Sequence, residues 1–151
     1  MRNRLFIAVT ALTGLFAWCA PASAGWLSST GPVIAIFGGE LFLGEAEGHL
    51  DGAGTIQIHS RTNPELGCRG EFTSSAELGG VGSMRCSDGI TASFQFQRLS
   101  ITRGYGTGSS SRGALSFTYG LSSSESGRYL RLPPGKMLSL GDMALELVDL
   151  K

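Results

Sequence analysis

Short runs of apolar or alternating residues, separated by glycine-rich turns, occupy the chain from residue 33 onward. The clearest alternation covers residues 90–97, where apolar and polar side chains exchange at every position. A period of two is that of a β-strand with one buried face. The apolar positions of this strand are Ile90, Ala92, Phe94 and Phe96. Similar runs predict strands at 33–37, 41–43, 55–59, 67–75, 82–87 and 114–119, with a short edge strand at 129–132.

Turn signals separate these strands. Asp51-Gly52 and Asp88-Gly89 each stand between two strand-like runs, which is a strong signal for a two-residue hairpin turn. Leu99 and Ile101 change the alternation after residue 97, so we expect either a bulge near Gln97-Arg98 or the end of the strand there.

Two segments are less regular. The run 104–111 consists of glycine, serine, threonine and tyrosine, and its composition predicts a flexible segment. Residues 143–148 fit a strand or a short helix, and the alternation of Leu145 and Leu147 favours the strand.

A Gly-x-Gly-Ser/Thr pattern occurs three times, at 52–55, 80–83 and 104–107. The spacing is too irregular for a duplicated repeat unit. Recurring turns or bulges explain it better, because glycine tolerates positive φ angles.

Together these elements predict an all-β domain over residues 25–151, built as an antiparallel meander of hairpins. A small β-sandwich and a partly open β-barrel both fit the pattern.

The two cysteines after the N-terminal region are expected to form one disulfide. If the turn between strands 67–75 and 82–87 is centred on Glu77, antiparallel pairing places Cys68 opposite Cys86. Directly opposed residues lie close enough for a bond after modest adjustment.

The first 24 residues match a secretory signal peptide. Arg2 and Arg4 precede an apolar run over 5–20, and Ala22-Ser23-Ala24 provides a cleavage site of small residues. The run is shorter than a membrane-spanning helix, and no second apolar segment follows. We therefore expect a periplasmic or extracellular protein. Lipid attachment at Cys19 is a second possibility, which the bulky Trp18 before it disfavours.

Charge argues against one class of partner. Removing Arg2 and Arg4 from 12 basic and 12 acidic residues leaves a net charge of −2 with histidine neutral. Proteins that bind nucleic acid usually carry a marked basic excess, so we expect no nucleic-acid partner.

Catalytic and metal-binding signals are weak. His49 and His59 are the only histidines, and no Gly-x-Ser-x-Gly nucleophile motif accompanies them. Two thiols without a neighbouring histidine supply too few ligands for zinc. No metal or cofactor is expected.

The second half of the chain carries arginines interspersed with tyrosines, with Glu125 as the only acid between residues 98 and 131. Arginine binds anions in a planar fork and stacks on rings, so this set is a candidate surface for an anionic glycan, a lipid or another envelope component. Ordinary surface arginines are the competing interpretation. The candidate residues are Arg98, Arg103, Tyr105, Arg112, Tyr119, Arg128, Tyr129 and Arg131.

The expected function is a non-catalytic structural or binding role in a cell envelope. One alternative is a small envelope hydrolase that uses His49 or His59. Another is a carrier whose barrel encloses an apolar ligand, with an empty interior lined by Phe94, Phe96 and Phe117.

Overall fold

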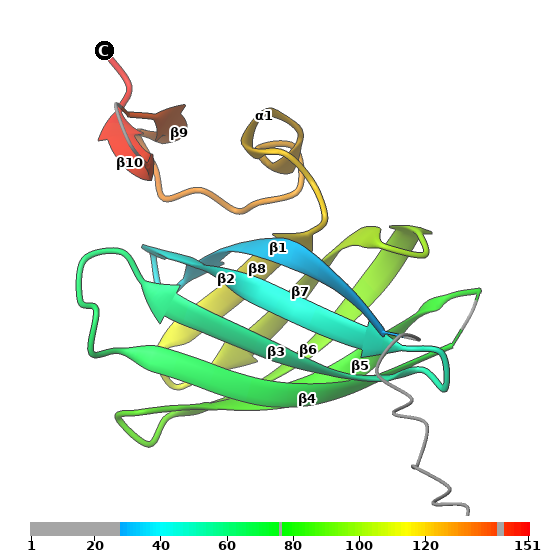
Figure 1. Ribbon diagram of the computed structural model, residues 1–151. Helices are drawn as coiled ribbons and strands as arrows, with labels where there is room; N and C mark the ends of the chain where they lie inside the picture. The colour runs from blue at the N-terminus through cyan, green and yellow to red at the C-terminus, as the bar shows by residue number, and fades with distance from the viewer. Residues whose placement is uncertain (1–27, 76, 142–143) are drawn as a thin grey trace, which may run out of the picture.

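A computed structural model describes residues 28–75, 77–141 and 144–151, so the predicted signal peptide lies outside the described residues. Eight antiparallel strands follow one another around a closed barrel (Figure 1). Each strand pairs with its neighbours in the chain, and the first pairs with the eighth. The strands are β1 (Ser28–Phe37), β2 (Glu40–His49), β3 (Ala53–Ser60), β4 (Gly67–Ser75), β5 (Gly79–Cys86), β6 (Thr91–Ser100), β7 (Arg103–Ser110) and β8 (Gly113–Tyr119).

The all-β antiparallel meander is confirmed, but the architecture is neither a sandwich nor a partly open barrel. Residues 33–37 of β1 form a continuous ladder with residues 115–119 of β8. This ladder joins the first and last strands of the sheet, so the barrel is closed.

The strand β7 was not predicted, because its sequence is rich in glycine. Gly104 and Gly106 are buried inside the barrel, where aromatic rings of the next strand cover them. A Cβ atom at Gly106 would lie 2.4 Å from Cζ of Phe117, and one at Gly104 would lie 2.3 Å from the hydroxyl of Tyr119. Glycine is required here by crowding from partner strands, which the local composition does not reveal.

The same crowding explains most of the Gly-x-Gly-Ser/Thr pattern. Only Gly52 among its glycines has a positive φ, at 87°, and so fits the turn explanation. The others lie beneath rings of adjacent strands. Phe72 covers Gly54, and Phe94 covers Gly82. The pattern therefore marks inward positions left without side chains so that a neighbouring ring fits.

The Asp-Gly turns and the bulge are present as predicted, but the turns are longer than the predicted two residues: residues 50–52 lie between β2 and β3, and residues 87–90 lie between β5 and β6. In both Asp-Gly turns the carboxylate accepts a hydrogen bond from the backbone N–H two residues later, at 2.9 Å for Asp51 and 3.1 Å for Asp88. The register of β6 against β7 shifts between Arg98 and Ser100, one position beyond the expected place.

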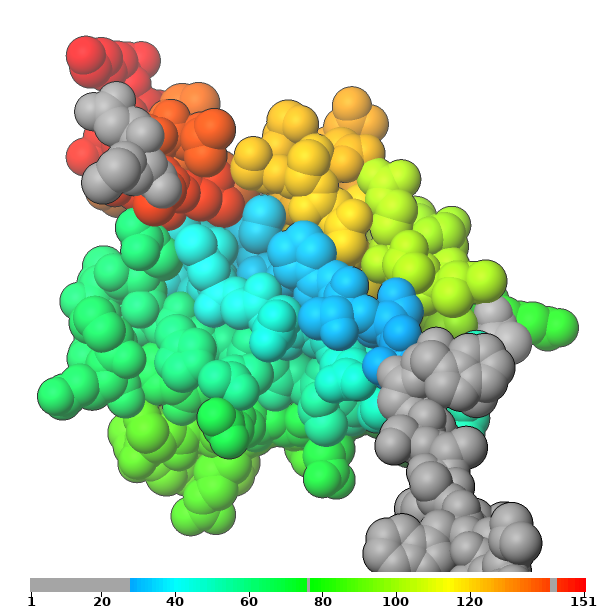
Figure 2. Space-filling view, viewed as in Figure 1, coloured from blue at the N-terminus to red at the C-terminus, as the bar shows by residue number. Residues whose placement is uncertain are grey.

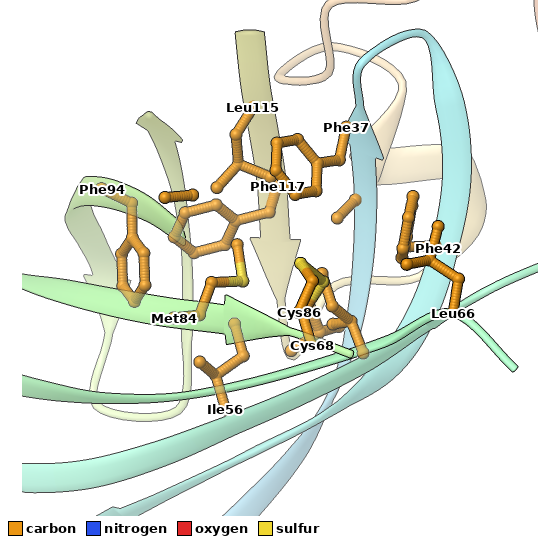
Figure 3. Packing of buried hydrophobic residues seen from close by; sticks show 14 of the residues in the cluster. Phe37, Phe42, Ile56, Leu66, Cys68, Met84, Cys86, Phe94, Leu115 and Phe117 are labelled. Carbon is orange, nitrogen blue, oxygen red and sulfur yellow. A yellow bond between two sulfur atoms is a disulfide. The ribbon is translucent and has the colours of Figure 1, made fainter. Parts of the chain in front are cut away.

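One end of the barrel is filled by side chains (Figure 3). We call it the closed end; it carries the turns β1–β2, β3–β4, β5–β6 and β7–β8. Cys68 and Cys86 are directly opposed in register and joined by a disulfide, as predicted. Their sulfur atoms pack inside the barrel near Phe42 and Leu66 (Figure 3).

Arg112 lies at the closed end, in the turn between β7 and β8. Its guanidinium forms an ion pair with Asp88 and lies 5.6 Å from the ring centroid of Phe37. A cation above an aromatic face is electrostatically favourable. Arg112 thus links two turns of this end to the core below them.

The chain after the barrel returns over the outer face of β1 and β2 (Figure 2). It forms the short helix α1 (Ser123–Ser126) and the hairpin of β9 (Lys136–Leu140) and β10 (Leu145–Asp149). A second apolar cluster holds it there. Its buried members are Ile34, Ile36, Leu41, Leu130 and Leu145.

This returning segment differs from expectation in two ways. No strand forms at 129–132, because the backbone N–H groups of Tyr129 and Leu130 donate to the carbonyl of Ser126 and continue the helical turn. The strand β9 was not predicted. The expected strand over 143–148 is confirmed from Leu145, while Met143 lies outside the described residues.

Candidate functional site

A pocket occupies the other end of the barrel, which we call the open end; it carries the turns β2–β3, β4–β5 and β6–β7. Its volume is about 320 Å³. Its deeper wall is apolar, and the residues that form it are Ala46, Ile56, Phe72, Phe94, Phe96 and Phe117. The barrel therefore divides into a filled half and a half that can hold a molecule.

The rings of the aromatic wall pack against one another in two groups. Phe94 packs edge-on against Phe117 with centroids 5.3 Å apart, and Phe96 packs edge-on against Phe72 at the same distance. Phe96 also contacts Tyr119, at 5.8 Å. Tilted aromatic pairs are favourable beyond the area they bury, so the rings hold one another in place.

Small residues keep the rest of the pocket open. Gly31 of β1 and Gly48 of β2 line it, as does Ala46. A Cβ atom at Gly48 would meet only Cζ of Phe72, at 4.0 Å. The space above Gly48 is therefore free for a ligand.

Two polar side chains face the pocket near its mouth. Arg98 of β6 and Tyr119 of β8 are both in register with Gly104 of β7, which lies between them without a side chain. Arg98 Nη2 donates to Ser74 Oγ at 2.6 Å, but its buried Nε has no hydrogen-bond partner among the described residues. The Tyr119 hydroxyl is likewise buried without a partner in that part of the chain.

Burial raises the pKa of the Tyr119 phenol, and the nearby charge of Arg98 lowers it by a smaller amount. The phenol therefore stays protonated at neutral pH and is available as a hydrogen-bond donor.

The three turns at the open end expose large apolar side chains. Leu50 is 77% exposed, Leu78 82% and Ile101 81%. The turns of the closed end expose no large hydrophobic residue among those described. The mouth of the pocket thus has an apolar rim, and the opposite end is polar.

The eight arginines and tyrosines proposed as a surface fall in separate places. Arg98 and Tyr119 face the pocket, and Arg112 lies at the closed end. Outside the barrel, Tyr105 stacks on Tyr129 with centroids 4.4 Å apart. The remaining arginines are also on the outside: Arg103, Arg128 and Arg131.

Arg103 is paired with Glu125 at the start of α1. Hydrogen bonds from the Ser122 hydroxyl, from Arg103 and from the Ser122 backbone lower the pKa of Glu125 to about 2. Ser122 and Glu125 form a reciprocal capping box, which satisfies backbone donors at the helix start.

We expect the contribution of Glu125 to the stability of α1 to depend on pH. Because its pKa is lowered in the folded state, that contribution is complete above the ordinary carboxyl range and is lost as pH falls towards about 2. An NMR titration of the Glu125 carboxyl would measure it. The Ser122→Ala variant serves as comparison, since its Glu125 should titrate closer to pH 4.5, the value for an unperturbed carboxyl. A wild-type midpoint near 4.5 would contradict the capping arrangement.

The two histidines lie apart. His49 is exposed at the mouth of the pocket. His59 is exposed near the closed end of β3, and its Nε2 is 2.8 Å from the side-chain nitrogen of Gln57. A histidine that activates a nucleophile is hydrogen-bonded to a hydroxyl and oriented by a carboxylate. Within the described residues neither histidine forms such a hydrogen bond.

No group of three or more potential metal ligands comes together within residues 28–75, 77–141 and 144–151. No helix in the same ranges is long and apolar enough to cross a membrane.

Part of the pocket was predictable and part was missed. Phe94, Phe96 and Phe117 line it as the carrier alternative expected. Arg98 is two residues after Phe96 and four after Phe94, so its side chain points into the barrel like theirs. The grouping of Arg98 with other arginines by charge did not use this alternation. Gly31 and Gly48 carried no sequence signal.

Comparisons of this chain with protein-family models, with curated protein sequences and with solved structures found no match. The pocket and its lining are therefore the basis on which a function can be proposed.

Proposed function

We propose that this protein is an exported binding protein that holds one small, largely apolar molecule in the open end of its barrel. The observation that carries the proposal is the aromatic pocket of about 320 Å³ beside a closed end that is filled by side chains. Barrels of eight strands are just wide enough to be filled or to hold one small ligand.

The size of the pocket limits the ligand. Ligand pockets are commonly about 300–1,000 Å³ and lined mainly by apolar and aromatic side chains, with a few polar groups. A volume of about 320 Å³ lies at the lower end of this range, so the expected occupant is one small molecule. A single acyl chain or a small ring system fits this limit.

The apolar rim supports entry at the open end. Leu50 and Ile101 line the mouth and offer apolar contacts to a molecule that leaves water. Transfer of apolar surface out of water is favourable in proportion to its area. A ligand can therefore be desolvated stepwise, first at the rim and then among the rings.

Export supports the same proposal. The Cys68–Cys86 disulfide forms readily in an oxidising compartment, which agrees with the leader-like sequence of residues 1–24.

The neutral fluorophore N-phenyl-1-naphthylamine tests the pocket. We expect saturable binding to the purified protein at one site per chain. Gly48→Leu should weaken this binding at least about tenfold, because the new side chain occupies the pocket. Backbone strain does not complicate this variant, since Gly48 is absent from the positive-φ glycines.

Gly127→Leu is the matched control. This glycine follows α1 outside the barrel, has a φ of −53°, and has no atom within 4 Å of an added Cβ. Its affinity should equal that of the wild type. Equal affinity of the Gly48→Leu protein, or the absence of saturable binding to the wild type, would refute the proposal.

A further inference from the structure

The pocket contains a positive charge, that of Arg98, which forms no ion pair among the described residues. The ion pairs formed among the described residues involve Arg103, Arg112 and Lys136, and not Arg98. None of the described residues that line the pocket is acidic. Arg98 is partly buried beside an apolar wall, where an unpaired charge is costly.

The unpaired charge has donors to offer. Within the part of the chain that the structure describes, Arg98 Nη2 donates to Ser74 Oγ, while the buried Nε–H has no acceptor. The Tyr119 hydroxyl is a second buried group without a partner among these residues. The two side chains are neighbours across Gly104, and because this residue has no side chain the Tyr119 hydroxyl lies directly over its backbone, on the strand that separates Tyr119 from Arg98.

The positions of these groups determine how a ligand would be oriented in the pocket. Arg98 and Tyr119 are close to the ends of β6 and β8 at the mouth, whereas Ile56, Phe94 and Phe117 form the deeper wall. A molecule that satisfies both regions has a negative group near the mouth and an apolar body below it.

We propose that the pocket selects apolar molecules that carry one anionic group, which accepts hydrogen bonds from Arg98 Nε and the Tyr119 hydroxyl. This inference rests on the proposed function, and it adds the chemical class of the ligand. A guanidinium binds carboxylate and sulfate oxygens through charge-assisted hydrogen bonds, which are stronger than neutral ones. The two side chains act here as binding residues, with no chemical step.

Isothermal titration with decanoate, decyl sulfate and decanol tests the selection. Both anions should bind at least about tenfold more tightly than the alcohol, because hydrogen bonds to a charged group in a partly buried site are worth more than neutral ones. The comparison of decanoate with decyl sulfate identifies which kind of anion is preferred. Either order supports the proposal, provided that both anions exceed decanol.

Two variants identify the groups responsible. Arg98→Leu should remove the preference for anions, so that decanoate and decyl sulfate bind no more tightly than decanol to this variant. Tyr119→Phe keeps the ring and should reduce anion affinity about threefold to tenfold, as expected for the loss of one hydrogen bond. Arg128→Leu is the matched control, since Arg128 is exposed outside the barrel, and its affinities should not change.

The outcomes separate the two proposals. If decanol binds as tightly as decanoate, and Arg98→Leu changes neither affinity, the selection for anions is refuted while the apolar pocket stands. If none of the three compounds binds and N-phenyl-1-naphthylamine also fails, the proposed function itself is refuted. Circular dichroism of each variant would verify the fold, and an unfolded Arg98→Leu protein would be replaced by Arg98→Gln under the same criteria.

Discussion

Replacing Cys68 and Cys86 together by alanine is expected to lower the free energy of unfolding by about 3 kcal/mol. The bond joins residues separated by 18 positions, and closing a loop of that length removes chain entropy from the unfolded state by roughly this amount. The alanines also leave the space of two buried sulfur atoms in the filled end of the barrel, which adds to the loss.

Urea unfolding of the double variant and the wild type, each with and without dithiothreitol, measures the effect. The wild type unfolded in reductant should approach the stability of the variant, and the variant should be unaffected by reductant. Identical urea midpoints for the variant and the oxidised wild type would contradict a stabilising role for the bond. Ligand affinity should change little, since neither cysteine lines the pocket.

The second large effect is expected at the glycines beneath the rings. Gly106→Ala should destabilise the barrel by about 1–3 kcal/mol, the usual range for an overpacked core. Its Cβ would lie 2.4 Å from Cζ of Phe117 and 2.5 Å from the carbonyl oxygen of Gln95. The carbonyl is part of the sheet and cannot move freely, so the ring and the strand must both shift.

Gly48→Ala is the matched control for this substitution, because its Cβ meets nothing closer than 4.0 Å inside the same barrel. Thermal unfolding should show a lower midpoint for Gly106→Ala and nearly the wild-type midpoint for Gly48→Ala. Both variants replace glycine by alanine in a strand, so the change in strand propensity is the same. Equal midpoints would therefore show that crowding against the Phe117 ring does not destabilise Gly106→Ala.

The hairpins were predictable because their signals are local. A turn centred on Glu77 fixes the pairing of β4 with β5, and that register alone placed Cys68 opposite Cys86. The Asp-Gly turns are equally local, since the aspartate bonds to a backbone group two residues away. Short-range rules therefore sufficed for these pairs of strands.

Closure of the barrel and the strand β7 depended on distant partners. Nothing within residues 103–110 favours a strand until Phe117 and Tyr119 of β8 are known to cover its glycines. Likewise, no local feature of β1 predicts that it pairs with β8. The pattern predicted strands and turns, but it did not determine how the first and last strands meet.

The candidate site, too, was predictable only in part. Alternation identified the ring-bearing face of β6, which lines the pocket. Arg98 and Tyr119 were grouped with surface residues by their chemistry, although each shares the parity of buried residues on its own strand. Tyr119 shares its parity with Leu115 and Phe117, which belong to the core inside the barrel, whereas Ser116 and Thr118 are buried on the outer face. Parity was the better guide to orientation than residue type.

The pairing of β1 with β8 has a consequence for how the molecule assembles. It is the one pairing in the barrel between strands remote in the chain, and it spans only residues 33–37 of β1. The pocket is lined on one side of this seam by Gly31 and on the other by Phe117 and Tyr119. The complete site therefore exists only after the ends of the sheet have met. Under the proposed function, a bound molecule touches both margins, and occupancy and barrel closure are then linked equilibria: a loaded barrel is expected to resist opening at this seam more than an empty one.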